Sequence, residues 1–346
     1  MNVLLISSSY IENSVKENFD VFINKSIEKL YLFKENHIDS YKDDCNISEN
    51  IKYEIQYIDE IEDIKELFEV YIIYDAILNK KYLCGWIEHF KKLNLVIKLM
   101  ASKAQLSEIE KYIPLNSFDK IYNADFLSNI KDSNIICKIQ DKPVIFIAGL
   151  SRFNQQMKVE LQLKKMLNQN NISCFMVSKY FINAECLISE EFLESSEPLL
   201  CKWSNLAREI QNHHDYCKSD VVIISLPLDI GEADILQHTN IFSALKVFCP
   251  NYTICCMPND KDLLDKIDSI VQLFESRYAS RLNTICISEY GNNKYEITNT
   301  DIPIKKSYKD FNNKALCLIV RSGEINCLYK DIIQKITYPD KIKLII

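Results

Sequence analysis

The stretch of sequence that decides the fold is PVIFIAGLSRFNQQMKVELQLKKML, which runs from Pro143 to Leu167. It begins with a continuous apolar run, Val144 to Ala148, that ends at Gly149. After a short polar turn, apolar residues recur mostly at helical spacing from about Gln155 onward. The pattern predicts a strand, a tight glycine turn and a helix. In α/β proteins this unit places the amide groups at the start of a helix beside the end of a strand, where phosphate groups are commonly held.

The predicted turn lacks most groups of a nucleotide-binding P-loop, whose pattern is GxxxxGK[ST]. Asn154 or Gln155 stands where the second glycine would come, and Gln156 or Met157 stands where the lysine and the hydroxyl belong. Lys158 follows one residue or more too late. Phosphoryl transfer depends on that cation and on that metal-binding hydroxyl. We therefore expect no catalytic residue in this turn, and we interpret it as a structural remnant or as a non-hydrolytic anion site.

Two charged side chains complete the candidate anion site. Arg152 would supply a positive charge to the start of the helix. Asp229 follows a second apolar run, Val221 to Ile224, at the place where a metal-binding carboxylate would lie; the alternative is a solvated loop residue. We expect no cofactor at this loop and keep a bound nucleotide as the alternative. The candidate residues are Gly149, Ser151, Arg152, Asn154, Gln155, Gln156, Lys158 and Asp229.

The overall composition excludes several classes of function. The chain has 346 residues, 47% hydrophobic and 26% charged, which is typical of a globular protein with sizeable cores. Its net charge is −7, so a concentrated basic surface for nucleic acid is not expected. It contains five glycines, too few for glycine-rich cofactor loops. The sequence has no CxxC pair and no HExxH motif, so we expect no metal site.

Cysteine usage and apolar run lengths predict a cytoplasmic protein with no membrane partner. The chain has 13 cysteines, and MNVLLISSSY at its start lacks the basic region of an export signal. Most of the cysteines are expected to be buried thiols. No uninterrupted apolar run approaches the roughly 20 residues that span a bilayer.

Apolar runs alternate with helical patterns along most of the chain, which predicts parallel strands joined by helices. The predicted fold class is therefore α/β, with two Rossmann-like or P-loop-like domains whose sheets are mainly parallel. We expect a Rossmann-like domain at residues 1–135, a degenerate P-loop-like domain at residues 142–290 and a small C-terminal extension at residues 291–346.

The second predicted domain resembles the clostridial peptide maturation system proteins. The resemblance rests on IFIAGLSRFNQQMKVELQLKKML, ISCFMVSKY, DVVIISLP and NYTICC, and it covers roughly residues 1–290, more loosely in the first half. In that family a hydrophobic strand leads into Gly-Leu, a short polar loop and a helix with a Val-x-Leu-x-Leu pattern, here Gly149, Leu150 and Val159 to Leu163. The family often has a lysine where this chain has Gln156.

The resemblance implies an accessory protein of radical-SAM-associated clusters that make ribosomally synthesised peptides. Such a protein would act as a scaffold for the precursor peptide, the radical-SAM modifying enzyme, or both, and it would resemble an NTPase without hydrolysing nucleotide. The sequence leaves room for a homo-oligomer. The competing hypothesis is an ATP- or GTP-dependent ligase or kinase with a non-standard phosphate loop, in which Lys158 and Asp229 take unusual roles.

Overall fold

Two compact units divide the chain. The first comprises Met1–Phe126, Tyr180–Asn183 and Leu187–Leu193, and the second comprises Leu127–Lys179, Ala184–Cys186 and Glu194–Ile346. The computed structural model describes residues 1–7, 15–23, 25–33, 52–61, 64, 66, 68–74, 80–101, 103–122, 137–139, 141–149, 154–178, 186–188, 192, 198–229, 235–257, 267–276, 282–287, 316–319 and 332.

The first unit contains a six-stranded sheet in the order β3-β2-β1-β4-β5-β6, and all its neighbouring strands are parallel. This is the strand order of a Rossmann fold. The strands are β1 (Asn2–Ile6), β2 (Lys29–Phe33), β3 (Glu54–Ile58), β4 (Phe68–Ile73), β5 (Val96–Met100) and β6 (Lys120–Tyr122). Its helical segments are η1 (Lys16–Asn18), α2 (Phe19–Ile23), α3 (Lys80–Lys92), α4 (Lys103–Ile109) and η4 (Leu115–Ser117).

The two faces of this sheet carry different side chains, because successive residues of a strand point to opposite sides. On one face Phe68, Val70 and Ile72 of β4 join a core to which α3 contributes Phe90. On the other face Tyr71 packs edge-on against Phe19 of α2, with ring centroids 5.7 Å apart. The alternation of β4 therefore separates an apolar face from a face that also holds polar groups.

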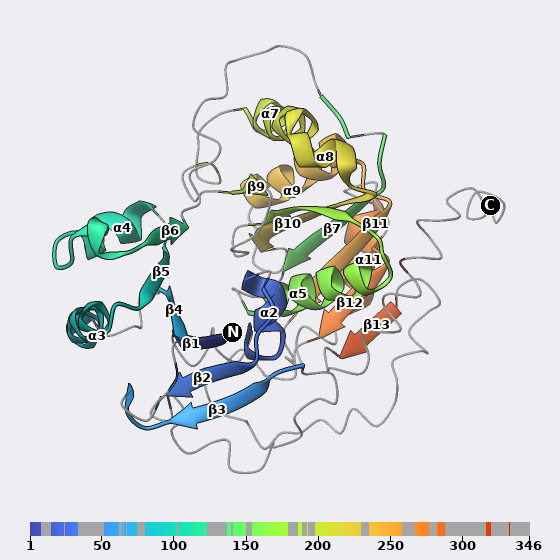
Figure 1. Cartoon of the computed structure of the whole chain (residues 1–346). Helices are drawn as coiled ribbons and strands as arrows, with labels where there is room; N and C mark the ends of the chain where they lie inside the picture. Colours follow the sequence, from blue (N-terminus) through green and yellow to red (C-terminus); the bar gives the residue numbers. More distant parts are fainter. Residues whose placement is uncertain are drawn as a thin grey trace. The chain divides into compact units, whose positions relative to one another are not determined.

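The second unit contains a seven-stranded sheet in the order β13-β12-β11-β7-β10-β8-β9 (Figure 1). The pairings that link β13, β12, β11, β7, β10 and β8 are parallel. The strands are β7 (Val144–Gly149), β8 (Cys174–Ser178), β9 (Cys186–Leu187), β10 (Val221–Asp229), β11 (Tyr252–Met257), β12 (Thr284–Ile287) and β13 (Leu316–Ile319). The helices are α5 (Asn154–Gln169), α7 (Leu199–Asn212), α8 (His214–Lys218), α9 (Ile235–Phe248) and α11 (Ile267–Ser276).

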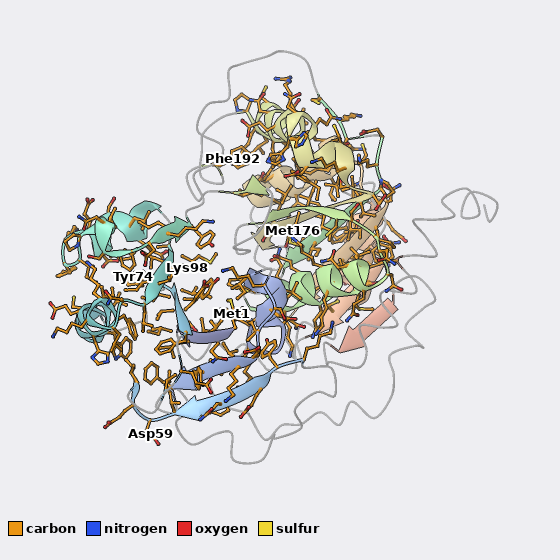
Figure 2. The ribbon with its side chains drawn as sticks, in the orientation of Figure 1. Met1, Asp59, Tyr74, Lys98, Met176 and Phe192 are labelled. Carbon is orange, nitrogen blue, oxygen red and sulfur yellow. The ribbon has the colours of Figure 1, made fainter. Side chains whose placement is uncertain are left out.

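Helices α7 and α9 pack against each other on one face of the second sheet (Figure 1). Phe146 of β7 stacks on Phe248 of α9 at 6.5 Å between ring centroids, and Trp203 of α7 meets the same ring at 6.0 Å. The Trp203 indole donates to Asn240 Oδ1 at 2.8 Å, so its buried polar group is satisfied. Met176 of β8 is fully buried within the packed side chains of this unit (Figure 2).

Asparagine ends two helices where a glycine is more usual. Asn94 follows α3 with φ 53°, and Asn171 follows α5 with φ 58°. Left-handed backbone is costly for most side chains, and asparagine tolerates it best after glycine. A chain with only five glycines therefore makes these turns with asparagine.

The structure confirms the α/β class and the strand and helix predicted between Pro143 and Leu167, which are β7 and α5; the predicted turn, at residues 150–153, lies outside the described residues. The described strand of the predicted C-terminal extension, β13, pairs in parallel with β12 and so extends the second sheet. No helix in the described ranges has the length and apolar character needed to cross a bilayer.

Candidate functional site

Three strand ends meet at Gly149. Its register partner on β10 is Asp229, and its register partner on β11 is Cys256. The pairing of β10 with β7 shifts between Leu226, which pairs with Ala148, and Asp229. This irregularity brings the backbone of Asp229 beside Gly149, as the candidate site requires, although these residues are 80 positions apart in the sequence.

The other candidate residues lie at the start of α5 or before it. Asn154 and Gln155 form the first helical turn, and the structure describes their backbone only. Ser151 and Arg152 lie outside the described residues, so the predicted positive charge of the site is not tested. The site thus consists of a glycine strand end, the first turn of a 16-residue helix and the end of β10 that carries Asp229.

Counted from Gly149, the GxxxxGK[ST] spacing puts Gln155 at the lysine position and Gln156 at the hydroxyl position, and the side chain of Gln156 points into the protein. It is 2% exposed, and its Nε2 donates to Ser225 Oγ at 2.7 Å and to the Leu226 carbonyl at 2.8 Å. The Ile147 carbonyl lies 3.3 Å from the same nitrogen. These acceptors belong to β7 and β10, so Gln156 ties the start of α5 to the two strands that lead into the site. Its amide is occupied within the fold.

Lys158 does not take over the role of that lysine. It lies two positions after Gln156, and a helix turns about 100° per residue, so the two side chains leave α5 on nearly opposite sides. Lys158 is partly exposed between the buried residues Met157 and Val159. The late lysine therefore does not point to the side of α5 that faces Ser225.

The sequence interpretation missed Glu160, which lies one helical turn after Gln156. Its side chain is fully buried, and it accepts hydrogen bonds from Ser178 Oγ, at 2.7 Å, and from Ser225 Oγ. Burial raises the pKa of Glu160 to about 7, although the two seryl hydroxyls act in the opposite direction. The sequence offers no signal for this residue, because glutamate is rarely buried and the helical spacing of α5 is accounted for by its apolar side chains.

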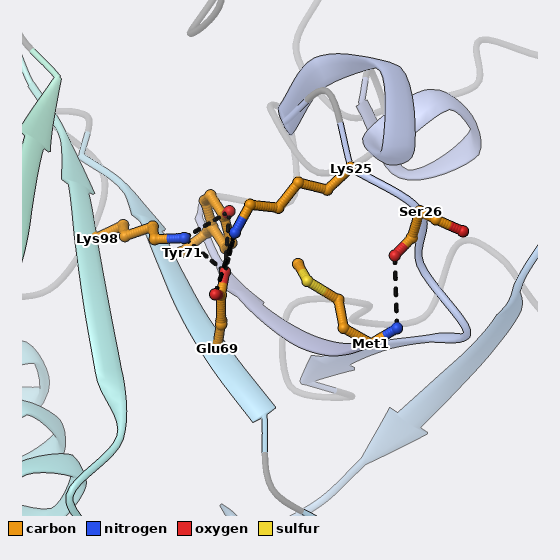
Figure 3. Close-up of polar contacts among 6 residues, drawn as sticks. All are labelled: Met1, Lys25, Ser26, Glu69, Tyr71 and Lys98. Atoms are coloured by element: carbon orange, nitrogen blue, oxygen red, sulfur yellow. Dashed lines mark hydrogen bonds and ion pairs between the residues drawn. The ribbon is translucent and has the colours of Figure 1, made fainter.

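A second polar cluster lies in the first unit, centred on Glu69 of β4 (Figure 3). Its carboxylate accepts from Lys98 of β5 at 2.5 Å, from Lys25 at 3.1 Å and from Tyr71 at 3.1 Å. Burial alone would raise the pKa of Glu69, but the hydrogen bonds from Lys98 and Lys25 outweigh it and the pKa is lowered. Figure 2 also shows Lys98 on its strand, with a side chain that is 9% exposed. The cluster links β4 to β5 and to the segment after α2.

The histidine before α8 and two cysteines of the second sheet have structural roles. His213 Nδ1 accepts from the backbone amide of Asp215 at 3.3 Å and so caps α8. Cys256 and Cys286 are register partners on β11 and β12, and both are buried. Within the ranges that the structure describes, no three histidine, cysteine or acidic side chains gather as a metal site would require.

Comparison with known proteins supports the fold and leaves the function open. No protein-family model matches the sequence, and no curated protein matches it. The crystal structure of a DUF1611 family protein from Anabaena variabilis covers 96% of this chain and 99% of its own, at 9% identity and a TM-score of 0.54. At that identity the likeness establishes the fold alone. Chloroplast FtsY from Physcomitrella patens matches 47% of this chain and 55% of its own, at 10% identity and a TM-score of 0.29.

Proposed function

We propose that this chain is a binding protein that does not transfer phosphoryl groups. The observation that carries the proposal is Gln156, which stands at the hydroxyl position of the motif, directly after an uncharged Gln155 at the lysine position, and donates its amide hydrogen bonds to β7 and β10. A phosphate-binding loop needs a cation that points out of the fold towards the ligand. Here neither Gln155 nor Gln156 has a charged side chain, Gln156 contributes to the packing of α5 on the sheet, and Lys158 leaves the helix on nearly the opposite side from Gln156.

Within that class, we propose an accessory role in the maturation of a ribosomally synthesised peptide. The support is the resemblance of the second unit to clostridial peptide maturation system proteins, carried by Gly149, Leu150 and the helix pattern from Val159 to Leu163. The partners would be the precursor peptide, its radical-SAM modifying enzyme, or both. The two parallel sheets would provide the scaffold that holds them.

Nucleotide hydrolysis by the purified full chain tests the first part of the proposal. We expect no release of phosphate from Mg-ATP or Mg-GTP above the buffer rate, and no change in Lys158→Ala. A hydrolysis rate that Lys158→Ala abolishes would overturn the proposal. The second part is tested by co-expression with a neighbouring radical-SAM enzyme and its precursor peptide, followed by affinity purification. A complex with either partner supports the role, and purification of the chain free of both contradicts it.

The second candidate function is a nucleotide-binding enzyme, and one observation favours it. The shift in the pairing of β10 brings Asp229 into register with Gly149, where a metal-bound phosphate would need a carboxylate. Ligand at 100 times its dissociation constant stabilises a protein by about 2.7 kcal/mol. A rise in melting temperature with millimolar Mg-ATP that is lost in Asp229→Asn would favour this candidate, and an unchanged melting temperature argues against it.

A further inference from the structure

Among the residues that the structure describes, no cation pairs with the carboxyl group of Glu160. Its two hydrogen-bond partners there are hydroxyls, Ser178 Oγ on β8 and Ser225 Oγ on β10. Ser178 directly follows Val177, which pairs with Ile224, so the two serines occupy equivalent positions on neighbouring strands. Glu160 therefore bridges the two strands from the helix above them.

The hydrogen bonds around Ser225 have a fixed direction. Gln156 Nε2 can only donate, so Ser225 Oγ accepts from it at 2.7 Å and uses its own proton to donate to Glu160 Oε1. The bond between Ser178 and Glu160 Oε2, at 2.7 Å, can run either way. It runs from the serine when Glu160 is ionised and from the carboxyl group when Glu160 is protonated. Both states keep the same heavy-atom contacts, but they differ in charge.

The elements that pack on Glu160 offer no described group that compensates a negative charge. Strand β8 presents Ser178 and β10 presents Ser225, while the sequence of β7 is VIFIAG, with no titratable side chain. Strand β11 presents the Cys256 thiol, whose pKa is raised mainly by Cys286 and by burial, and also by the charge of Glu160. The desolvation cost of an ionised Glu160 is therefore offset only by the two hydroxyls, which favours the protonated acid.

We propose that Glu160 is a proton-linked latch: the protonated carboxyl group fastens α5 to the ends of β8 and β10, and loss of the proton weakens that attachment. The latch acts on the candidate site because Ser225 also accepts from Gln156, which holds the Leu226 carbonyl just before the shift that positions Asp229. A rise in pH therefore loosens the strand end beside Gly149. This inference does not depend on the identity of any ligand.

Unfolding of the full chain by urea at a series of pH values tests the latch in wild type and in Glu160→Gln. The folded state holds a proton that the unfolded state releases above its ordinary pKa of 4.5. The unfolding constant of wild type relative to Glu160→Gln should therefore rise by up to about tenfold per pH unit between about pH 4.5 and 7. A constant ratio across that range overturns the proposal. Glu275→Gln, an exposed carboxyl group of α11 in the same unit, is the matched control and should leave the ratio to wild type flat.

Three further measurements test the latch without Glu160→Gln, in case that variant does not fold. Ser225→Ala removes a hydrogen-bond donor to the ionised carboxylate of Glu160, so the pH range over which the stability falls should move to higher pH. A move of that range to lower pH overturns the proposal. Infrared difference spectra of wild type between pH 5 and 8 should show loss of a protonated carboxylic acid, and this signal should be weakened or shifted in Ser225→Ala. Hydrogen exchange should report faster opening of α5 and the end of β10 above the transition; exchange that is unchanged there contradicts the latch.

Discussion

Glu69 lies on a strand of the first sheet and Glu160 on a helix that packs against the second, and the two carboxyl groups differ in burial and in their partners: the Glu69 side chain is 25% exposed, whereas Glu160 is fully buried. Glu69 accepts from two ammonium groups and a phenol, whereas Glu160 accepts from two serines. The pKa of Glu69 is lowered and that of Glu160 is raised to about 7. Burial acts to raise the pKa in both cases; at the partly exposed Glu69 the hydrogen bonds from two lysines outweigh it, whereas at the fully buried Glu160 the two hydroxyls do not.

A carboxyl group in a sheet or packed against one can therefore serve two different purposes. With lysines beside it, as at Glu69, the group remains charged and crosslinks neighbouring strands with little dependence on pH near neutrality. With hydroxyls alone, as at Glu160, it exchanges a proton near neutral pH and makes the attachment conditional. Variants that break the first cluster and variants that remove Glu160 should therefore change the pH dependence of stability in different ways.

The largest expected effect is that of Glu69→Leu. The variant leaves the Lys98 ammonium, whose side chain is 9% exposed, without its anion. Removing one member of a buried ion pair costs about 3 kcal/mol. Urea unfolding should show that loss, and Glu69→Leu combined with Lys98→Met should recover at least half of it. A double variant as unstable as Glu69→Leu would mean that the unpaired ammonium is not the cause.

The two acidic residues should give stability profiles of opposite sign against pH. Glu69 has a lowered pKa, so its contribution is present above pH 4.5 and is lost as the pH falls through its folded value. Glu160 has a raised pKa, so stability falls as the pH rises from 4.5 to about 7, by about 3 kcal/mol at most.

The chain offers a fluorescent probe in each unit for this comparison. Trp86 lies on α3 in the first unit and Trp203 on α7 in the second. Trp86→Phe leaves Trp203 to report the second unit, which should lose stability towards neutral pH. If the double variant Trp86→Phe and Glu160→Gln loses stability with rising pH as steeply as Trp86→Phe alone, a group other than Glu160 is responsible.

The strand and the helix on either side of residues 150–153 could be predicted from sequence because their apolar spacing is local. The absence of a lysine at Gln155 or Gln156 could be read from the motif for the same reason. What Gln156 does instead depends on Ser225 and Leu226, which are 69 and 70 positions away, and spacing along the chain contains no information on that contact.

Glu160 and the shift before Asp229 could not be predicted for related reasons. Helical periodicity marks Val159 and Leu161 as core and gives no sign that the glutamate between them is also buried. Its two serines come from separate strands, and their meeting depends on the strand order of the folded sheet. The pairing of Asp229 with Gly149 depends on an irregularity in β10 that neither residue reveals.

Gln156→Lys tests whether a packed polar residue at this position can be replaced by a phosphate-binding cation. The lysine cannot reproduce the amide contacts without burying an ammonium, so unfolding should become easier by about 2 kcal/mol. The added lysine should also produce no hydrolysis of Mg-ATP. Gln156→Glu, which has the same size but no donor to the Leu226 carbonyl, is the matched comparison and should also be destabilised.

The smallest expected effect separates the two lysines of Glu69. Lys25 makes its contacts at 3.1 Å with a side chain that is 41% exposed, so solvent competes with the pair and Lys25→Met should cost about 0.5 kcal/mol. Lys98 remains to hold the carboxylate, and the pKa of Glu69 should stay below its ordinary value. Urea unfolding at 0.05 and 0.5 M NaCl measures this, and added salt should remove most of the difference from wild type because an exposed pair is screened. A loss as large as that of Glu69→Leu would show that the two ammonium groups act as one unit around the carboxylate.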